Sequence, residues 1–137
     1  MLRVLTYNVR RANGNSLSAL AQMLRAQQPD AVALIEPSPP AQIDALARAL
    51  GMRAIYAQQD SPPLAWLCRL PVAGGQSYDY QPSRSLLRLD ADWHGQRVSL
   101  FAVHLRPGLT SRDEQARGRE VVALLEYLPR VMGEPHL

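Results

Sequence analysis

The sequence contains no lysine, a single cysteine and a single phenylalanine among its 137 residues. One cysteine excludes an intrachain disulfide and a metal cluster built on cysteine. That residue, Cys68, lies in the apolar stretch AWLCRL, which is typical of a small buried side chain rather than a nucleophile. No stretch approaches the roughly 18 consecutive apolar residues of a membrane span, and MLRVLTYNV is too short and too interrupted for a signal peptide. We therefore expect a cytoplasmic protein without a membrane span.

The net charge is small, but the type of basic residue is unusual. All 15 basic residues are arginine, and 12 acidic residues leave a formal net charge of +3. Guanidinium groups suit bidentate contacts with phosphate, but a GC-rich genome produces the same bias, and we give that explanation the larger share. A charge of +3 does not indicate nucleic acid on its own and leans away from a dedicated duplex binder.

The length is that of one globular domain, which can remove roughly two-thirds of its unfolded surface from water. Strand patterns at residues 2–9 and 30–35 flank a helical pattern that Ser16 can cap. Because the connecting loops are short, the two strands are expected to run parallel. Further predicted elements are a helix at 41–50 ended by Gly51, strands at 53–57 and 64–70, and a hairpin of strands 85–92 and 97–105 around Gly95. Ser111 can cap a last helix of about 17 residues, with Val121, Leu124, Leu125 and Leu128 on one face.

Polar side chains close three of the predicted strands. Asn8 and Glu36 lie at or next to the C-terminal ends of two parallel strands, and open α/β sheets bind ligands at that edge. By alternation, Asn8 shares a face with Thr6, whereas Glu36 shares one with Leu34. His104 ends the apolar run VSLFAVHL in a similar way. Each has an ordinary structural alternative: a turn asparagine, a solvated loop carboxylate and a hydrogen-bonded histidine beside the core.

Arginines near these positions favour phosphate as the ligand. Arginine forks bind phosphate oxygens, and a hard metal ion on a carboxylate would polarise them. Glu36 can begin a Mg²⁺ site but not complete it, because Mg²⁺ takes one or two carboxylates plus water and phosphate oxygens. The arginines concerned are Arg10, Arg11, Arg69, Arg106 and Arg112.

The order of these segments resembles the endonuclease/exonuclease/phosphatase superfamily, the deoxyribonuclease-like Mg²⁺-dependent hydrolases. LRVLTYNV resembles its first strand, with Asn8 at the family's asparagine. QQPDAVALIEP resembles the segment pDvvaLQE, so Glu36 falls on the metal-binding glutamate, although Ile35 replaces the glutamine that often precedes it. GQRVSLFAVHLRP resembles the strand ending in tHL, so His104 falls on the phosphate-contacting histidine. LAWLCRLPV is similar to the aIlSR.Pv strand, and RDEQARGREVVALLEYL to the arginine-containing helix that follows.

The resemblance implies an α/β (α+β) fold, a four-layer α/β/β/α sandwich of which this chain would form about half. Residues 1–137 would be a single incomplete domain, one mixed sheet with helices on its outer face. The family continues with a strand bearing GDFN and an aspartate-histidine pair, which this sequence lacks; Gly133 and Pro135 are typical of the approach to such a strand. Because half a sandwich would expose a large apolar sheet face, we expect a truncated sequence, with a homodimer through that face as the alternative.

The function that the resemblance implies is metal-dependent hydrolysis of phosphate esters, as a phosphodiesterase, nuclease or phosphatase, with Mg²⁺ or Mn²⁺ as cofactor. Glu36 would hold the metal, Asn8 would position phosphate or the attacking water, and His104 would stabilise charge on the phosphoryl oxygens. Arg112 and Arg69 are further candidates for phosphate contact.

Without the GDFN and aspartate-histidine residues, which include the general base, the chain alone is expected to be inactive. The alternative function is a non-catalytic half-domain that dimerises and binds phosphate or nucleic acid. DNA, RNA, phosphoinositides, sphingolipid headgroups and small nucleotides all stay open as substrates.

Overall fold

The computed structural model of the protein describes residues 1–9, 14–37, 39–57 and 63–133. The interpretations that concern Arg10, Arg11 and Pro135 lie outside these residues. The elements in chain order are β1 (Val4–Asn8), α1 (Gly14–Gln27), β2 (Ala31–Ile35), α2 (Pro40–Leu50), β3 (Arg53–Tyr56), β4 (Leu64–Cys68), β5 (Val72–Gln81), β6 (Arg84–Trp93), β7 (Gln96–Val103) and α3 (Ser111–Met132).

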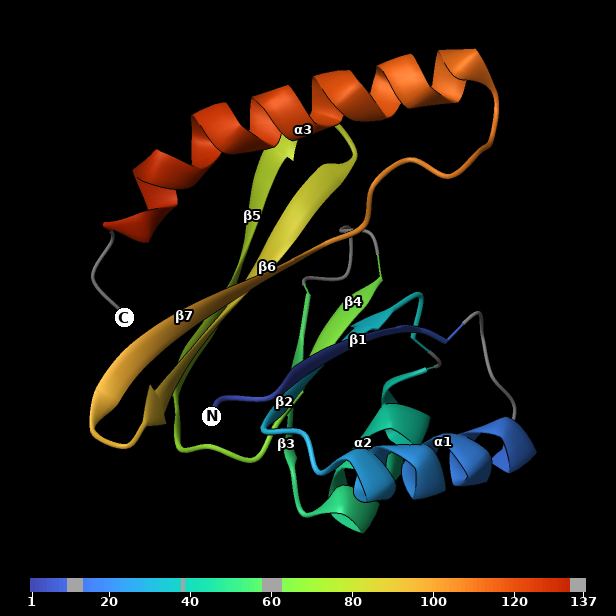
Figure 1. The fold of residues 1–137 in the computed structure, drawn as a ribbon, viewed down its shortest axis with the longest axis vertical. Coiled ribbons are helices and arrows are strands. Elements are labelled where there is room, and N and C mark those ends of the chain that lie inside the picture. The colour runs from blue at the N-terminus through green and yellow to red at the C-terminus, as the bar shows by residue number, and fades with distance from the viewer. Residues whose placement is uncertain (10–13, 38, 58–62, 134–137) are drawn as a thin grey trace.

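The first half of the chain forms a mixed sheet, sheet A, with the strand order β1-β2-β4-β3 (Figure 1). β1 and β2 run parallel, from Val4 opposite Ala31 to Asn8 opposite Ile35, which confirms the arrangement predicted from the short loops around α1. β4 runs antiparallel to both of its neighbours. The apolar faces of α1 and α2 cover one side of this sheet, in a core that includes Leu24, Leu34 and Ile43.

The second half forms an antiparallel sheet, sheet B, with the order β5-β6-β7. The hairpin of β6 and β7 was predicted, and Gly95 adopts a φ of 80° at its turn. The sequence patterns did not predict β5, in which two glycines interrupt the alternation of apolar and polar residues. At Gly75 a Cβ atom would collide with Cγ2 of Ile55, so the absence of a side chain lets β5 approach β3 closely.

The two sheets pack face to face around a second core. Small and aromatic side chains of β2 and β4, among them Ala33 and Trp66, meet Leu87 and Leu89 of β6. Across this interface the indole Nε1 of Trp66 donates a hydrogen bond of 3.0 Å to the carbonyl oxygen of Leu87. Cys68 is 1% exposed in the same core, and burial raises the pKa of its thiol, in agreement with its predicted role as a buried hydrophobic residue.

α3 lies on the outer side of sheet B, so the layers are helices, sheet A, sheet B and helix (Figure 1). The expected α/β class and half-sandwich with a mixed sheet are confirmed, and the chain contributes strands to both sheets. α3 has 22 residues rather than about 17, and its N-cap is Thr110 rather than Ser111. Ser16 likewise lies inside α1 and is not its cap.

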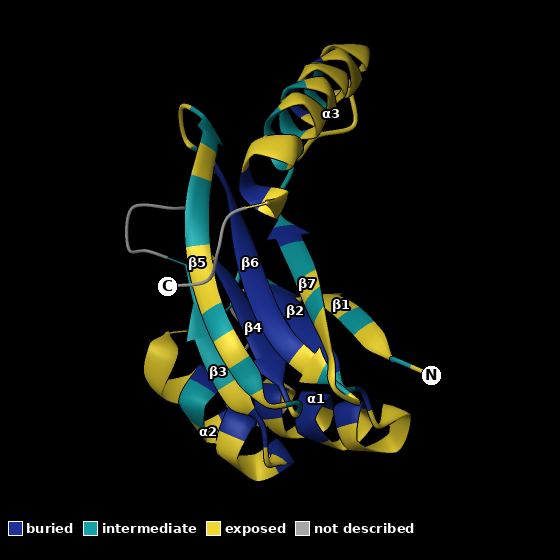
Figure 2. Cartoon of the chain, turned by 90° about the vertical axis from the view of Figure 1, so that its left-hand side faces the viewer, coloured by how far each residue is buried: buried dark blue, intermediate teal, exposed yellow. Residues whose placement is uncertain are grey.

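The large exposed apolar sheet face expected of a half-sandwich does not occur among the described residues, because each sheet covers the other (Figure 2). Exposed apolar side chains lie instead on the edge strand β1, where Val4 is 41% exposed, and on α3. The predicted apolar face of α3 is only partly buried. Leu124 and Leu128 are half-buried, whereas Val121 and Leu125 are 37% and 61% exposed. The fully buried positions of the helix are Ala116, Glu120 and Val131. No helix in the described part of the chain is long and apolar enough to cross a membrane.

Candidate active site

Three strand ends from both sheets meet at one edge of the sandwich. Asn8 is the last residue of β1, and Glu36 and His104 directly follow β2 and β7. The amide of Val9 donates a hydrogen bond of 2.8 Å to the carbonyl oxygen of Ile35, which keeps β1 and β2 paired up to this edge. The parallel pairing therefore places Asn8 next to the residue that precedes Glu36, as the sequence pattern predicted.

Glu36 has an unusual backbone conformation. Its φ is +52°, in the left-handed region, which costs a residue with a Cβ atom about 1–2 kcal/mol. Its amide donates a hydrogen bond of 3.0 Å to the carbonyl oxygen of Pro63, which anchors the turn to the start of β4. Strict alternation would have placed Glu36 on the helix-covered face with Leu34. The left-handed turn ends that alternation, and the carboxylate instead reaches a residue that follows sheet B.

That residue is His104. Its Nε2 atom lies 3.2 Å from Oε1 of Glu36, and the two side chains are 20% and 35% exposed. A pair this exposed contributes at most about 1 kcal/mol to stability, so the apolar core between the sheets, not this contact, holds the sandwich together. Both groups are open to solvent on one side and could contact a ligand there.

Asn8 is exposed at the end of β1. Because Asn8 pairs in register with Ile35, the two side chains share a face of sheet A, and Ile35 packs into the core between the sheets. Asn8 therefore belongs to the face of sheet A that looks toward sheet B, the side on which Glu36 meets His104.

The candidate arginines are not gathered in the same way. Arg69 follows β4, which runs antiparallel to β2, and its amide bonds to the carbonyl oxygen of Asp30 before β2 begins. Arg69 lies at the opposite end of sheet A. Because β2 has five residues, this end is roughly 15 Å from the edge that carries Glu36. The structure does not bring Arg69 together with the other candidates. Arg112 is exposed in the first turn of α3.

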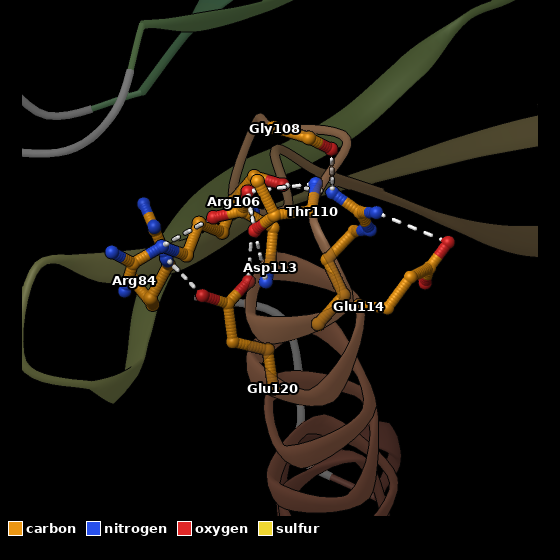
Figure 3. Close-up of polar contacts among 8 residues, drawn as sticks. Arg84, Arg106, Gly108, Thr110, Asp113, Glu114 and Glu120 are labelled. Atoms are coloured by element: carbon orange, nitrogen blue, oxygen red, sulfur yellow. Dashed lines mark hydrogen bonds and ion pairs between the residues drawn. The ribbon is translucent and has the colours of Figure 1, made fainter.

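Side chains of α3 hold the loop that follows His104, and the candidate residues named from the sequence did not include them (Figure 3). We call this group, Asp113, Arg117 and Glu120, the loop clamp. Its sequence signals are a Thr-x-x-Asp capping box and charged residues spaced three or four apart on one helix face. The Thr110 hydroxyl and amide, and to a smaller degree Arg106 and Arg117, lower the pKa of the Asp113 carboxyl, which therefore stays ionised at neutral and mildly acidic pH.

A divalent metal would find one suitable ligand here. The described residues contain no group of three or more histidine, cysteine, aspartate or glutamate side chains arranged for a metal ion. Mg²⁺ does not need such a group, since it binds one or two carboxylates and completes its shell with water and phosphate oxygens. The carboxylate of Glu36 fits that role, whereas the imidazole of His104 suits transition metals such as zinc better than Mg²⁺.

Comparison with known proteins gives a fold rather than a close relative. No family model matches the sequence. No curated protein matches it either. Solved structures do match: D. rerio TDP2 complexed with single strand DNA product has a TM-score of 0.75 and 21% identity, covering 95% of this chain and 55% of that one. A truncated TDP2 from Caenorhabditis elegans has a TM-score of 0.76 and 20% identity, covering 98% and 57%.

An endonuclease/exonuclease/phosphatase family protein from Bacteroides thetaiotaomicron matches with a TM-score of 0.66 and 17% identity, covering 94% of this chain and 59% of that one. The chain therefore has the endonuclease/exonuclease/phosphatase fold that the sequence motifs suggested. It spans about half the length of these structures.

Proposed function

We propose that this chain supplies one side of the active site of a metal-dependent phosphate ester hydrolase. The observation that carries the proposal is the contact between Glu36 and His104 beside Asn8, at an edge where strands of both sheets end. Two matched structures agree with phosphate ester chemistry: the D. rerio TDP2 structure holds a single strand DNA product, and another is a mannosyl-6-phosphatase from Bacteroides thetaiotaomicron.

Each residue has a distinct role in this proposal. Glu36 holds Mg²⁺ or Mn²⁺, which when bound polarises the phosphoryl oxygens. His104 donates a hydrogen bond to a non-bridging phosphoryl oxygen and stabilises the negative charge that grows there. Asn8 orients the phosphate or the attacking water, and Arg112 is the remaining candidate for phosphate contact. Phosphate esters include nucleic acid, so a nucleic acid strand is one candidate substrate.

The first test measures metal binding and activity of the purified chain. We expect Mn²⁺ to broaden the NMR signals of Asn8 and His104, and Glu36→Gln to abolish this broadening because the amide is a poor ligand for a hard cation. Asp79→Asn, which removes an exposed carboxylate of β5, is the matched control and should leave it intact. Mg²⁺-dependent hydrolysis of bis(p-nitrophenyl) phosphate should be negligible, since the described residues offer no second carboxylate grouped with Glu36 and His104 to serve as base.

Two results would count against this proposal. One is Mn²⁺ broadening that persists in Glu36→Gln. The other is robust hydrolysis by the chain alone that Glu36→Ala abolishes, which would show that the chain needs no further residues for catalysis.

The second candidate function is a non-catalytic half-domain that forms a homodimer and binds phosphate or nucleic acid. The observation that favours it is the outward side of α3, where Val122 is 55% and Leu125 is 61% exposed, one helical turn apart. Light scattering should then give twice the monomer mass, and Leu125→Glu should restore a monomer. A monomeric wild-type chain would remove this candidate.

A further inference from the structure

The loop between β7 and α3 takes its shape from side chains of α3. It begins directly after Val103, the last residue of β7, which still pairs with Leu86 of β6. It has no regular secondary structure, so its backbone groups need partners outside a ladder. Figure 3 shows that the loop clamp supplies several of them.

Glu120 is the innermost member of the clamp and is only 7% exposed. Its Oε2 atom accepts a hydrogen bond of 2.8 Å from the backbone amide of Arg106, and its Oε1 atom accepts one of 3.0 Å from Nε of Arg84. One buried carboxylate thus joins α3, the start of β6 and the loop. A charge-assisted bond to a buried carboxylate is stronger than an ordinary loop contact.

Arg117 and Asp113 hold the next part of the loop. Nη1 of Arg117 donates hydrogen bonds of 3.1 Å and 2.6 Å to the carbonyl oxygens of Arg106 and Gly108. Oδ2 of Asp113 accepts a hydrogen bond of 3.1 Å from the amide of Thr110. Gly108 has a φ of 123°, and a Cβ atom there would collide with the Asp113 carboxylate, so the loop lies directly against the helix.

The position of His104 follows from these contacts. Val103 is fixed in the ladder of sheet B, and the amide of Arg106 is fixed by Glu120. Only His104 and Leu105 lie between these two points. The backbone of His104 therefore has little freedom, and its imidazole is directed toward Glu36, 3.2 Å away.

The geometry points to Arg117 and Glu120 as positioning residues for His104. They touch no candidate reacting group, and they act by fixing the backbone on the C-terminal side of the histidine. This inference rests on the proposed function, in which His104 must meet a phosphoryl oxygen near a metal held by Glu36. An error of 1 Å in such an arrangement costs a large part of the rate.

The base of the clamp is itself rigid, because α3 is also anchored at its other end. Nη1 of the buried Arg88 in β6 donates a hydrogen bond to the carbonyl oxygen of Val131. α3 is therefore bound to sheet B at Glu120, through Arg84, and again near its C-terminal end, so Glu120 cannot shift without breaking a buried polar contact.

The test compares local order at His104 with global stability in Arg117→Ala and Glu120→Ala. The measurements are the NOE between the His104 ring and the side-chain methylene protons of Glu36, the exchange rate of the Arg106 amide, and the melting temperature. We expect both variants to weaken the NOE at least about twofold, and Glu120→Ala to speed Arg106 exchange about tenfold or more, since the amide loses its buried acceptor. Glu120→Gln keeps an acceptor oxygen, and Arg117→Lys keeps one donor, so each should recover part of the NOE.

Arg119→Ala is the matched control, because Arg119 is an exposed arginine on the same helix. It should leave the NOE and the exchange rate unchanged. A lower melting temperature with an unchanged NOE in both alanine variants would overturn the inference, because the clamp would then be a stabilising contact alone. These measurements need neither metal nor phosphate. The positioning role can therefore be refuted while Mn²⁺ still binds at Glu36, or supported when Mn²⁺ does not bind.

Discussion

Replacement of Arg88 by alanine is expected to lower the free energy of unfolding by about 3–5 kcal/mol. Arg88 and Asp90 are each 3% exposed on the outer face of β6. Nε of Arg88 lies 2.9 Å from Oδ2 of Asp90, and the same guanidinium group donates to the end of α3 at Val131. Alanine would leave a buried carboxylate without this cation and a carbonyl oxygen without this donor.

Urea unfolding followed by circular dichroism measures this loss. Arg97→Ala, which removes an exposed arginine from β7 of the same sheet, should change the free energy of unfolding by less than about 0.5 kcal/mol. The double variant Arg88→Met with Asp90→Leu should be more stable than Arg88→Ala, because it removes both buried charges. If the double variant were the less stable one, the pairing of charges would not explain the cost.

Most of sheet A could be predicted from the sequence because its signals are local. The β-rich run of β1, the apolar run of β2, the helical spacing in α1 and α2 and the cap at Gly51 are all set by neighbouring residues, and Gly51 does adopt a left-handed φ of 63°. β5 could not be predicted in this way. Its Gly75 is explained by Ile55 of the other sheet, a contact that no local pattern in the sequence reveals.

The length of α3 has a similar tertiary cause. Pro129 is a usual stop signal, since it lacks the amide that continues a helix. The helix nevertheless runs on to Met132, where the carbonyl oxygen of Val131 accepts a hydrogen bond from the buried Arg88. A contact with a residue 43 positions earlier in the chain thus accompanies the extra turn.

One part of the candidate site could likewise be predicted from the sequence, and another part could not. The proximity of Asn8 and Glu36 could be predicted, because parallel strands bring their C-terminal ends to one edge. His104 was a candidate from its place at the end of a strand and from the family resemblance. Its contact with Glu36 could not be predicted, since it joins two sheets and depends on a left-handed turn at Glu36. Arg69 was misplaced for the opposite reason: the antiparallel pairing of β4 with β2 sends it to the far end of the sheet.

The second large effect is expected from substitutions of Glu36 in its left-handed turn. Glu36→Gly and Glu36→Ala both remove the carboxylate, so both should abolish the Mn²⁺ broadening at His104 completely. Their stabilities should differ in an unusual order. Glycine adopts a φ of +52° without the steric cost that alanine carries there, so Glu36→Gly should be the more stable variant by about 1 kcal/mol, even after its larger loss of chain entropy. In an ordinary strand or helix alanine is the more stable of the two.

Thermal unfolding of the two variants beside wild type measures this difference, which should appear as a gap of roughly 4 °C in Tm. Glu36→Asn is the matched control, since asparagine tolerates the left-handed region and keeps a short polar side chain. We expect Glu36→Asn to be about as stable as Glu36→Gly. Like Glu36→Gly and Glu36→Ala, it should lose metal binding. If Glu36 lowers the stability of the fold and its replacement abolishes metal binding, the residue serves binding rather than folding. If alanine proved as stable as glycine at this position, the turn would carry no strain and the conformation of Glu36 would no longer support a functional site.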